Sequence, residues 1–154
     1  MVYAVIRVRG TVNVKPDIKK TMDLLRLTHA NHCVLLEEND VYKGMLQMVK
    51  DYTTWGEINK ETLSKLLSMR GRLIGEKPLT KEYLKKATSY ESFDKLSEAL
   101  LDNTVRYKEI PEIKPYFRLS PPKKGYRTVK RAFVNKGSLG YRKEKINTLI
   151  ERML

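Results

Sequence analysis

In the first 58 residues, the spacing of hydrophobic positions switches repeatedly between that of a strand and that of a helix. The segment 2–9 (VYAVIRVR) is rich in β-branched residues and predicts a strand. The segment 16–27 opens with proline and aspartate, which favour a helix start, and its apolar residues recur at i, i+4 and i+7. The short apolar run 33–36 (CVLL) predicts a second strand.

The same alternation continues to residue 58. Asp40 is the predicted N-cap of a second helix, whose apolar stripe runs from Val41 to Tyr52. Residues 55–58 predict a third strand. The order β-α-β-α-β predicts the α+β class: a compact two-layer core with both helices on one face of a small sheet.

The segment 59–112 has the hydrophobic spacing of helices but no cluster of candidate functional residues. Gly71 is expected to end its first helix, while Thr80 and Ser92 are expected to open two more. These helices predict an annex packed on the core. At the C-terminus, the apolar spacing over 146–153 predicts a short amphipathic helix that docks back on the body.

Charge changes the picture for the last quarter of the chain. The stretch 114–145 contains eleven Lys and Arg residues and one acid, which gives 11 − 1 = +10 of the chain's net +13. Aromatic residues lie among these cations, and proline and glycine interrupt regular structure. We therefore divide the chain into a core (1–58), a helical annex (59–112) and a basic extension with a C-terminal helix (113–154).

Concentrated positive charge beside stackable rings suits a phosphate polymer, through counterion release and base stacking. A solvated basic face is the alternative reading of the same charge. No apolar run approaches the ~20 residues of a membrane-spanning helix, so a membrane partner is not expected. The start of the chain lacks the pattern of a signal peptide. Cys33 is the single cysteine, which fits a reducing cytoplasm.

The sequence predicts neither a metal site nor a catalytic site. The run His29 to Cys33 offers three potential metal ligands, but there is no second ligand cluster, so we predict no metal site. No glycine-rich phosphate loop, paired carboxylates or nucleophile–base motif is present. The sequence therefore predicts a protein that is not an enzyme and uses neither a cofactor nor a small-molecule substrate.

One position in the core is unusual for a helix. Gly44 lies near the start of the second predicted helix, where glycine costs about 1 kcal/mol relative to alanine. Its missing side chain would let a phosphate approach, with Lys43 beside it as the cation. Close packing against another helix explains the glycine equally well.

Six sequence blocks run through the chain from end to end: RVRGTVNV at 7–14, LLRL at 24–27, NHCVLL at 31–36, YKGMLQMVKDYTTWGEI at 42–58, FRLSPPKKGY at 117–126 and GSLGYRKEKINTLIERM at 138–153. In this order they resemble the large-subunit ribosomal protein numbered thirty, in its long archaeal form. The eukaryotic counterpart of that family is the large-subunit protein numbered seven. The core resembles the short bacterial version, and the remainder resembles the archaeal and eukaryotic extension.

The resemblance implies a core with an antiparallel sheet, similar to the ferredoxin-like fold. It also implies a structural component of the large subunit of the cytoplasmic ribosome. The expected partners are the 23S-type ribosomal RNA, with the 5S RNA close by, and neighbouring large-subunit ribosomal proteins.

The resemblance places two segments at the RNA, and the charge pattern extends the second. The family's RNA-facing positions correspond to Lys43, Gly44, Arg118, Pro121, Pro122, Lys123, Lys124, Gly125 and Tyr126. The cations and rings of the basic stretch add Arg127, Lys130, Arg131, Lys136, Tyr141, Arg142 and Lys143. Ser120 departs from the family, which most often has histidine there, and this puts one base or phosphate contact in doubt.

A general RNA-binding or RNA-chaperone protein outside the ribosome is the main alternative, because charge and rings alone do not name the RNA. Such modules often carry an aromatic platform on a sheet, and no such pattern is recognisable in the sequence. A DNA-binding protein is a further alternative.

Overall fold

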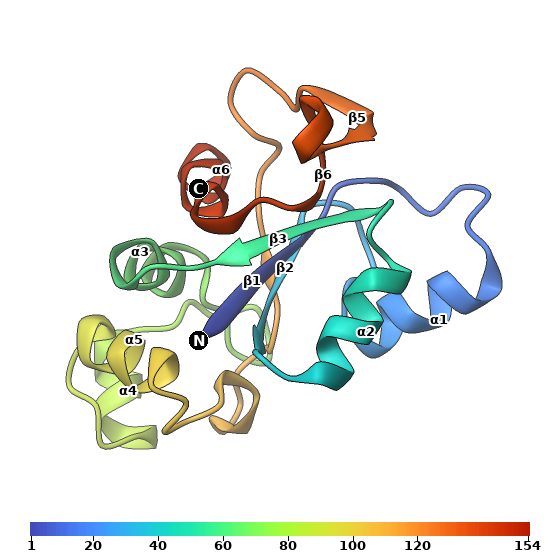
Figure 1. The fold of residues 1–154 in the computed structure, drawn as a ribbon. Helices are drawn as coiled ribbons and strands as arrows, with labels where there is room; N and C mark the ends of the chain where they lie inside the picture. Colours follow the sequence, from blue (N-terminus) through green and yellow to red (C-terminus); the bar gives the residue numbers. More distant parts are fainter.

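The computed structural model describes residues 1–154 and shows one mixed sheet with helices packed on it (Figure 1). The six strands lie in the order β4-β2-β1-β3-β6-β5. Their bounds are β1 (Val2–Arg7), β2 (His32–Glu37), β3 (Thr53–Glu57), β4 (Phe117–Arg118), β5 (Thr128–Ala132) and β6 (Gly137–Tyr141).

Six α-helices and three 3₁₀ turns connect these strands. The α-helices are α1 (Pro16–Leu24), α2 (Asp40–Met48), α3 (Lys60–Arg70), α4 (Lys81–Ala87), α5 (Phe93–Leu101) and α6 (Ile146–Met153). The 3₁₀ turns are η1 (Tyr107–Glu109), η2 (Phe133–Asn135) and η3 (Lys143–Lys145). The predicted α+β class and the β-α-β-α-β order of the first 58 residues are confirmed.

The register of the central strands is antiparallel, as the resemblance implied. Val5 of β1 lies opposite Val34 of β2 on one side and opposite Trp55 of β3 on the other. The sheet is nevertheless larger than predicted, because the C-terminal extension adds strands at both edges. β4 pairs antiparallel with β2, whereas β6 pairs parallel with β3. The complete sheet is therefore mixed.

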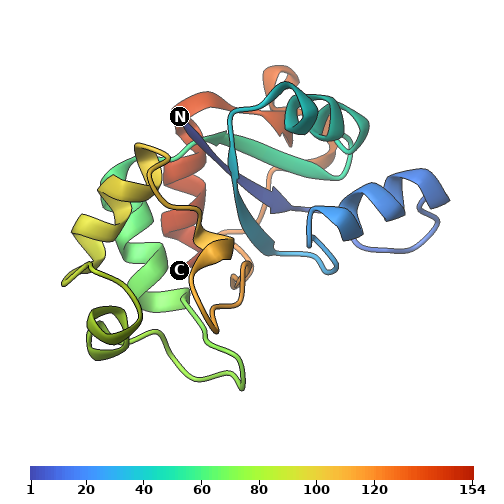
Figure 2. The same cartoon turned by 90° about the horizontal axis from the view of Figure 1, so that it is seen from below.

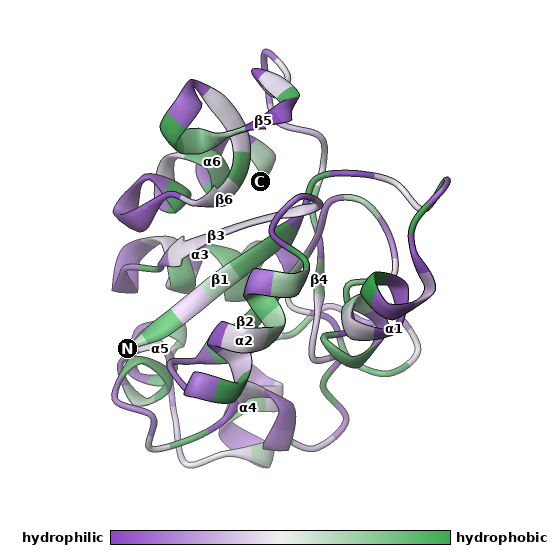
Figure 3. Ribbon diagram, turned by 45° about the vertical axis from the view of Figure 1, so that its right-hand side comes forward, coloured by the Kyte–Doolittle hydropathy of each residue, from purple (hydrophilic) through white to green (hydrophobic).

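β1 is buried along its whole length because both faces of the sheet are covered. Tyr3 and Val5 pack with residues of α1 and α2, while Ala4 and Ile6 pack with residues of α3, α5 and α6. In Figure 3, β1 accordingly carries green, hydrophobic colour through the middle of the molecule. The expected two-layer core is thus the central part of a three-layer structure, since the annex and α6 cover its second face.

Several helix ends differ from the prediction by a few residues. Asn39, not Asp40, is the N-cap of α2, and its side-chain oxygen accepts from the amide of Val41 at 3.1 Å. α1 ends at Leu24 because Arg26 adopts a φ of 61°, a left-handed conformation that ends a helix. The predicted helix boundaries in the annex, including Gly71 after α3, are confirmed.

The predicted C-terminal helix does dock on the body. Asn147 of α6 donates to the carbonyl of Glu57 at 3.0 Å and accepts from the amide of Asn59 at 3.0 Å. Gly56 permits this close approach, because a Cβ at that position would collide with the carbonyl of Lys143. The last residues of the chain therefore complete the layer that faces the annex.

Candidate nucleic-acid interface

Loops from distant parts of the sequence meet at one end of the sheet because of the strand directions. β1 and β4 end there, whereas β2, β3 and β6 begin there. β5 pairs with the start of β6 and overhangs the same end (Figure 1). We call this region the basic end and define it as residues 8–15, 25–31, 49–52 and 119–136.

The basic end is charged almost entirely with one sign. Its single acidic residue is Asp51. Its ten cations are Arg9, Lys15, Arg26, Lys50, Lys123, Lys124, Arg127, Lys130, Arg131 and Lys136. None of these cations takes part in a salt bridge, and every salt bridge of the molecule lies elsewhere. A set of unpaired cations on convergent loops is an electrostatic site for an anionic polymer.

A buried arginine holds two of these loops together. Arg7 is 1% exposed at the end of β1. Its guanidinium donates to the carbonyls of Leu27 at 2.7 Å and Thr28 at 2.9 Å, and to those of Arg9 at 2.9 Å and Gly10 at 3.1 Å. Burial lowers the pKa of Arg7 from its ordinary value. Because its donors reach carbonyls rather than carboxylates, Arg7 clamps the two loops without forming a salt bridge.

The segment 119–126 has a fixed backbone because it caps the C-terminal end of α6. The amides of Ser120 and Lys123 donate to carbonyls of the last turn of α6 at 3.0 and 2.9 Å. Arg152 in turn donates to the carbonyls of Lys123 and Gly125, the latter at 2.7 Å. Lys123 and Lys124 are exposed on this fixed loop. The loop therefore presents the two lysines to solvent in a defined place.

Two residues predicted at the RNA serve as internal anchors of the same loop. Pro122 is buried. Tyr126 packs at the edge of the main core, and its hydroxyl donates to Oδ1 of Asn31 at 2.7 Å. Burial raises the pKa of Tyr126 to about 12. Ser120, which departs from the family pattern, is also engaged internally, since Arg70 donates to its hydroxyl at 2.6 Å.

Arg142 lies inside the protein. Its Nε donates to Oγ1 of Thr54 at 2.8 Å and its Nη2 donates to the carbonyl of Ser138 at 2.7 Å. Its guanidinium also lies 4.8 Å from the ring centre of Phe133. Burial lowers the pKa of Arg142 to about 10, so the group stays charged at neutral pH. The structure gives Arg142 the task of holding η2 and β6 together.

The β5 region projects from the body. Lys130 and Arg131 lie on exposed positions of β5, and Lys136 follows in a left-handed conformation with a φ of 60°. Val134 in the connecting turn is 86% exposed. Figure 3 shows purple, hydrophilic residues on this projection. Arg118, by contrast, is part of β4 and pairs with Glu76 of the annex at 3.1 Å.

Lys43 and Gly44 lie at the opposite end of the sheet from the basic end, since α2 starts where β2 finishes. Lys43 pairs with Glu38 at 3.0 Å. A Cβ on Gly44 would meet nothing within 4 Å, so no packing inside this chain requires glycine there. Of the two explanations for Gly44, close packing is therefore wrong for this chain. The other explanation, that glycine lets a phosphate approach the helix from outside the chain, stays a prediction.

A patch of three aromatic side chains lies close to Lys43. Tyr3 donates to Glu38 at 3.3 Å and meets Tyr141 edge to face, with ring centres 6.3 Å apart. The rings of Trp55 and Tyr141 are 6.4 Å apart, and the Tyr141 hydroxyl donates to Glu57. We call these three rings the aromatic patch. The structure thus brings Lys43 and Tyr141 together, although both are separated from Lys123 and its neighbours.

Residues of the core contribute to the basic end and to the aromatic patch, and the sequence did not predict this contribution. Arg9, Arg26 and Lys50 lie at the basic end, but the core and annex together contain nearly balanced charge, which hid them. Their positions just outside predicted strands were the available signal. The aromatic patch combines positions 3, 55 and 141 from three strands, and only the sheet register reveals it.

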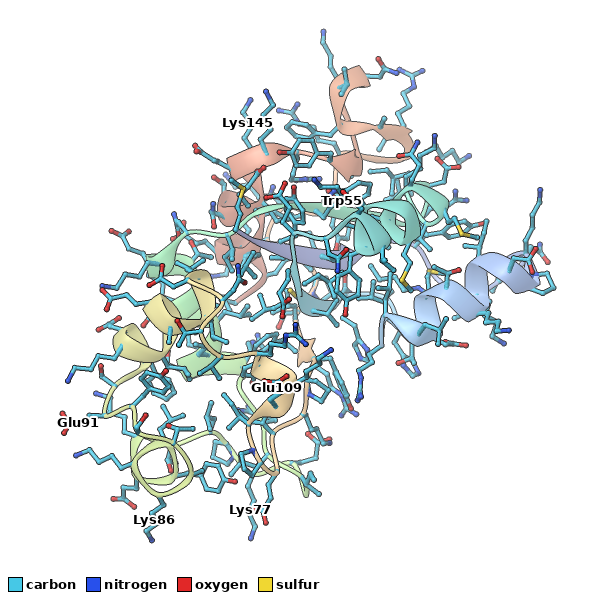
Figure 4. The ribbon with its side chains drawn as sticks, turned by 60° about the horizontal axis from the view of Figure 1, so that its bottom comes forward. Trp55, Lys77, Lys86, Glu91, Glu109 and Lys145 are labelled. Atoms are coloured by element: carbon cyan, nitrogen blue, oxygen red, sulfur yellow. The ribbon has the colours of Figure 1, made fainter.

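Two cations at the far side of the annex point away from both sites. In Figure 4, Lys77 and Lys86 project from one side of the molecule and Lys145 projects from the other.

No group of three His, Cys, Asp or Glu side chains is placed to hold a metal ion. Cys33 is buried, which raises the pKa of its thiol to about 12. No helix has the length and apolar character needed to cross a membrane.

An α+β fold whose unpaired cations gather on loops at one end of the sheet is typical of nucleic-acid-binding proteins. The family model described as "Ribosomal protein L30p/L7e" matches residues 3–53. Similar proteins include the large ribosomal subunit protein uL30 of Methanocorpusculum labreanum, which is 49% identical over 98% of this chain and 99% of its own length. Those of Methanosphaera stadtmanae and Archaeoglobus fulgidus are 48% and 46% identical over 99% and 98% of this chain and 99% of their own lengths.

The chain belongs to the L30p/L7e family of ribosomal proteins, whose members are structural rather than enzymatic. The resemblance inferred from the six sequence blocks is thereby confirmed, including its long archaeal form.

Proposed function

We propose that the basic end fixes this protein to large-subunit ribosomal RNA, as a structural component of the large subunit of the cytoplasmic ribosome. Family membership supports the ribosomal assignment, with ribosomal RNA and other ribosomal proteins as partners. One observation carries the assignment of the site: none of the ten cations of the basic end has an acidic partner, whereas seven cations elsewhere form salt bridges. Phosphates would supply the missing negative charge through counterion release.

Within this site, the residues divide between contact and support. We assign phosphate contacts to the exposed cations Lys123, Lys124, Arg127, Lys130, Arg131 and Lys136, with Arg118 at their edge. Pro121 and Gly125 shape the exposed turn. Pro122 and Tyr126 support this turn from inside, and Arg142 holds η2 to β6, so the three residues act on RNA binding through the backbone.

A smaller contact is proposed at the opposite end of the sheet. There Lys43 and Gly44 lie beside the aromatic patch, which includes Tyr141, and Lys143 lies on the adjacent turn η3. The open space over Gly44 supports an approach by an RNA backbone. The exposed edge of the aromatic patch supports stacking of an unpaired base.

The three predicted segments take different roles in this proposal. The core (1–58) and the extension (113–154) supply the RNA-facing loops, while the annex (59–112) supports the sheet from behind. The partner is the 23S-type ribosomal RNA, and we place the protein near the 5S RNA. The family resemblance supports the 5S neighbourhood.

The aromatic patch also favours a second candidate, a general RNA-binding role outside the ribosome. Sucrose-gradient sedimentation after a high-salt wash distinguishes the two. Sedimentation with the large subunit supports the ribosomal role, whereas protein that remains free supports the second candidate.

The site is tested by the double variant Lys123→Ala/Lys124→Ala in the full-length protein. Each phosphate contact contributes about 0.7–0.9 to the slope of log affinity against log salt concentration. The variant should therefore flatten the slope by roughly 1.4–1.8 and weaken binding to unrelated RNA sequences alike. Fluorescence anisotropy at several salt concentrations measures both quantities.

The matched control is Lys85→Ala/Lys86→Ala, which removes two adjacent exposed lysines of the annex. Its slope should equal that of the wild type. Equal slopes for both variants would reject the basic end as the RNA site.

A further inference from the structure

Half of strand β2 has an unpaired outer edge. β4 pairs only with His32 and Cys33, so Val34–Glu37 has no neighbour on that side. The amide of Glu38 donates to Met1, while Val2 accepts from Ile58 on the other side of β1. In an antiparallel strand, the backbone groups of successive residues face alternate sides. Because the backbone of Glu38 faces β1, the amides and carbonyls of Glu37 and Leu35 face the outer side of β2. Two amides and two carbonyls are thus directed away from the sheet.

The chain's own residues do not continue the pairing. Extending the β2–β4 register would place Pro115 opposite Leu35, and proline has no amide to donate. Ile113, which would come opposite Glu37, instead bridges to Leu73 in the annex. β4 therefore stops at two residues, and the second half of β2 keeps an open edge.

An apolar groove runs beside this open edge, with a volume of about 220 Å³. In Figure 2, β2 passes between η1, drawn in orange, and α1, drawn in blue. The groove is lined from these elements and from α5, with Leu24, Leu35, Leu100 and Val105 among its apolar residues. Leu24 is 66% exposed, which is high for a leucine.

A polar group without a partner lies in the same lining. Tyr107 is 5% exposed and its ring stacks on Phe117 at 5.0 Å. Its buried hydroxyl has no hydrogen-bond partner within the chain. A buried hydroxyl normally has a partner, because leaving it unpaired costs about 1–3 kcal/mol. Tyr107, one of the residues that line the groove, therefore carries a hydroxyl without a partner in the chain.

The charges around the groove are mainly positive. Arg106 is neutralised by Glu37 at 2.6 Å. Arg26, where the basic end meets the groove, and Lys108 have no salt-bridge partner. An occupant with a carboxylate would complement them.

We propose that the open half of β2 accepts an extended segment of a neighbouring protein as an added strand. Leu35 and Glu37 supply the main-chain hydrogen bonds, as in other cases of strand addition. An apolar side chain of the segment fills the groove, and an acidic side chain faces Arg26 and Lys108. RNA fits this site less well, because its phosphates would make no use of the apolar lining. The inference rests on the proposed place in the large subunit.

Site-specific crosslinking in assembled large subunits tests the proposal. The photo-crosslinker p-benzoylphenylalanine replaces Leu24 in the groove and, in a matched variant, Val134 at the basic end. Both side chains are exposed and apolar, so neither replacement disturbs the core. We expect at least fivefold more protein than RNA product from position 24, and the reverse from position 134.

The two positions separate the two claims. RNA as the main product at position 24, or no product there, would overturn the strand-addition proposal. Failure at position 134 would instead count against the basic end as the RNA site. A protein product at position 24 must also map to one segment of one large-subunit protein, because scattered products would indicate chance contact.

Two further measurements examine the chemistry of the groove. Lys108→Glu should lower the crosslink yield from position 24 several-fold, whereas Lys85→Glu in the annex should leave it unchanged. Hydrogen exchange of the segment 34–38 should slow at least tenfold between the free protein and the subunit. Unchanged exchange would show that the edge stays open and would reject the added strand.

Discussion

The two ends of the six-stranded sheet differ in whether acidic side chains neutralise their cations. At the basic end, ten cations stand against one acid and none forms a salt bridge. At the opposite end, Lys43 pairs with Glu38, and the tyrosines 3 and 141 donate to carboxylates. Both ends carry cations on helices and loops, so the difference lies in the acids that accompany them.

This contrast shows that strand direction sorts charge that the linear sequence spreads out. The loops of the basic end come from four separate ranges of the chain, and each contributes cations. The acidic residues Glu38, which follows β2, and Glu57, which ends β3, lie where those strands finish at the other end. Repulsion among unpaired cations destabilises the free protein, and bound phosphate would remove that repulsion.

The largest expected effect comes from removing the clamp that holds the basic end together. Arg7→Met should lower the free energy of unfolding by about 2–4 kcal/mol, because it leaves the carbonyls of Leu27 and Gly10 without donors. Urea denaturation measures this change. Arg9→Met serves as the control and should cost less than about 0.5 kcal/mol, since its side chain is at the surface. Equal losses in the two variants would contradict the clamp.

A smaller effect concerns the pH dependence of stability at the basic end. Burial, with His29, Arg118 and Arg7 nearby, lowers the pKa of His32 to about 4. The unfolded chain therefore binds this proton at a pH where the folded chain does not, so stability falls as pH drops from about 6.5 to 4.

The variant His32→Asn should remove this component, which we place at about 1–2 kcal/mol. Urea denaturation of both proteins across this pH range gives the difference, in which the titration of carboxyl groups elsewhere cancels. Parallel pH profiles for the two proteins would contradict a lowered pKa of His32 in the folded protein.

The smallest expected effect sharpens the contrast from the opposite end. Lys43→Ala should change RNA affinity less than about twofold, because Glu38 already neutralises its charge. Glu38→Gln should raise the affinity slightly by freeing that lysine. Filter binding at low salt measures both. A loss for Lys43→Ala as large as that for Lys123→Ala would make the two ends equivalent.

Periodic features of the fold were predictable from the sequence. The strands and helices of the first 58 residues, the boundaries in the annex and the docking of α6 follow hydrophobic spacing and capping residues. β4 is two residues long and has no period to detect, so its pairing with β2 could not be predicted. The parallel pairing of β3 with β6 could not be predicted either, because it joins residues more than eighty positions apart.

The composition of the site was predictable but the role of individual residues was not. The excess of cations marked the extension correctly as the most basic part of the chain. Charge alone could not show that Arg142 points inward while Lys123 points outward, since that depends on the packing of η2 and α6. Nor could it show that Arg9 and Arg26 of the core lie at the same end.

The most direct measurement is the chemical reactivity of lysines in the free protein and in purified large subunits. Acetylation followed by mass spectrometry reports each lysine separately. We predict that Lys123, Lys124, Lys130 and Lys136 lose at least tenfold in reactivity within the subunit, while Lys85 and Lys86 change less than twofold. Uniform protection of all lysines, or protection confined to the annex, would contradict the assignment of the basic end to ribosomal RNA.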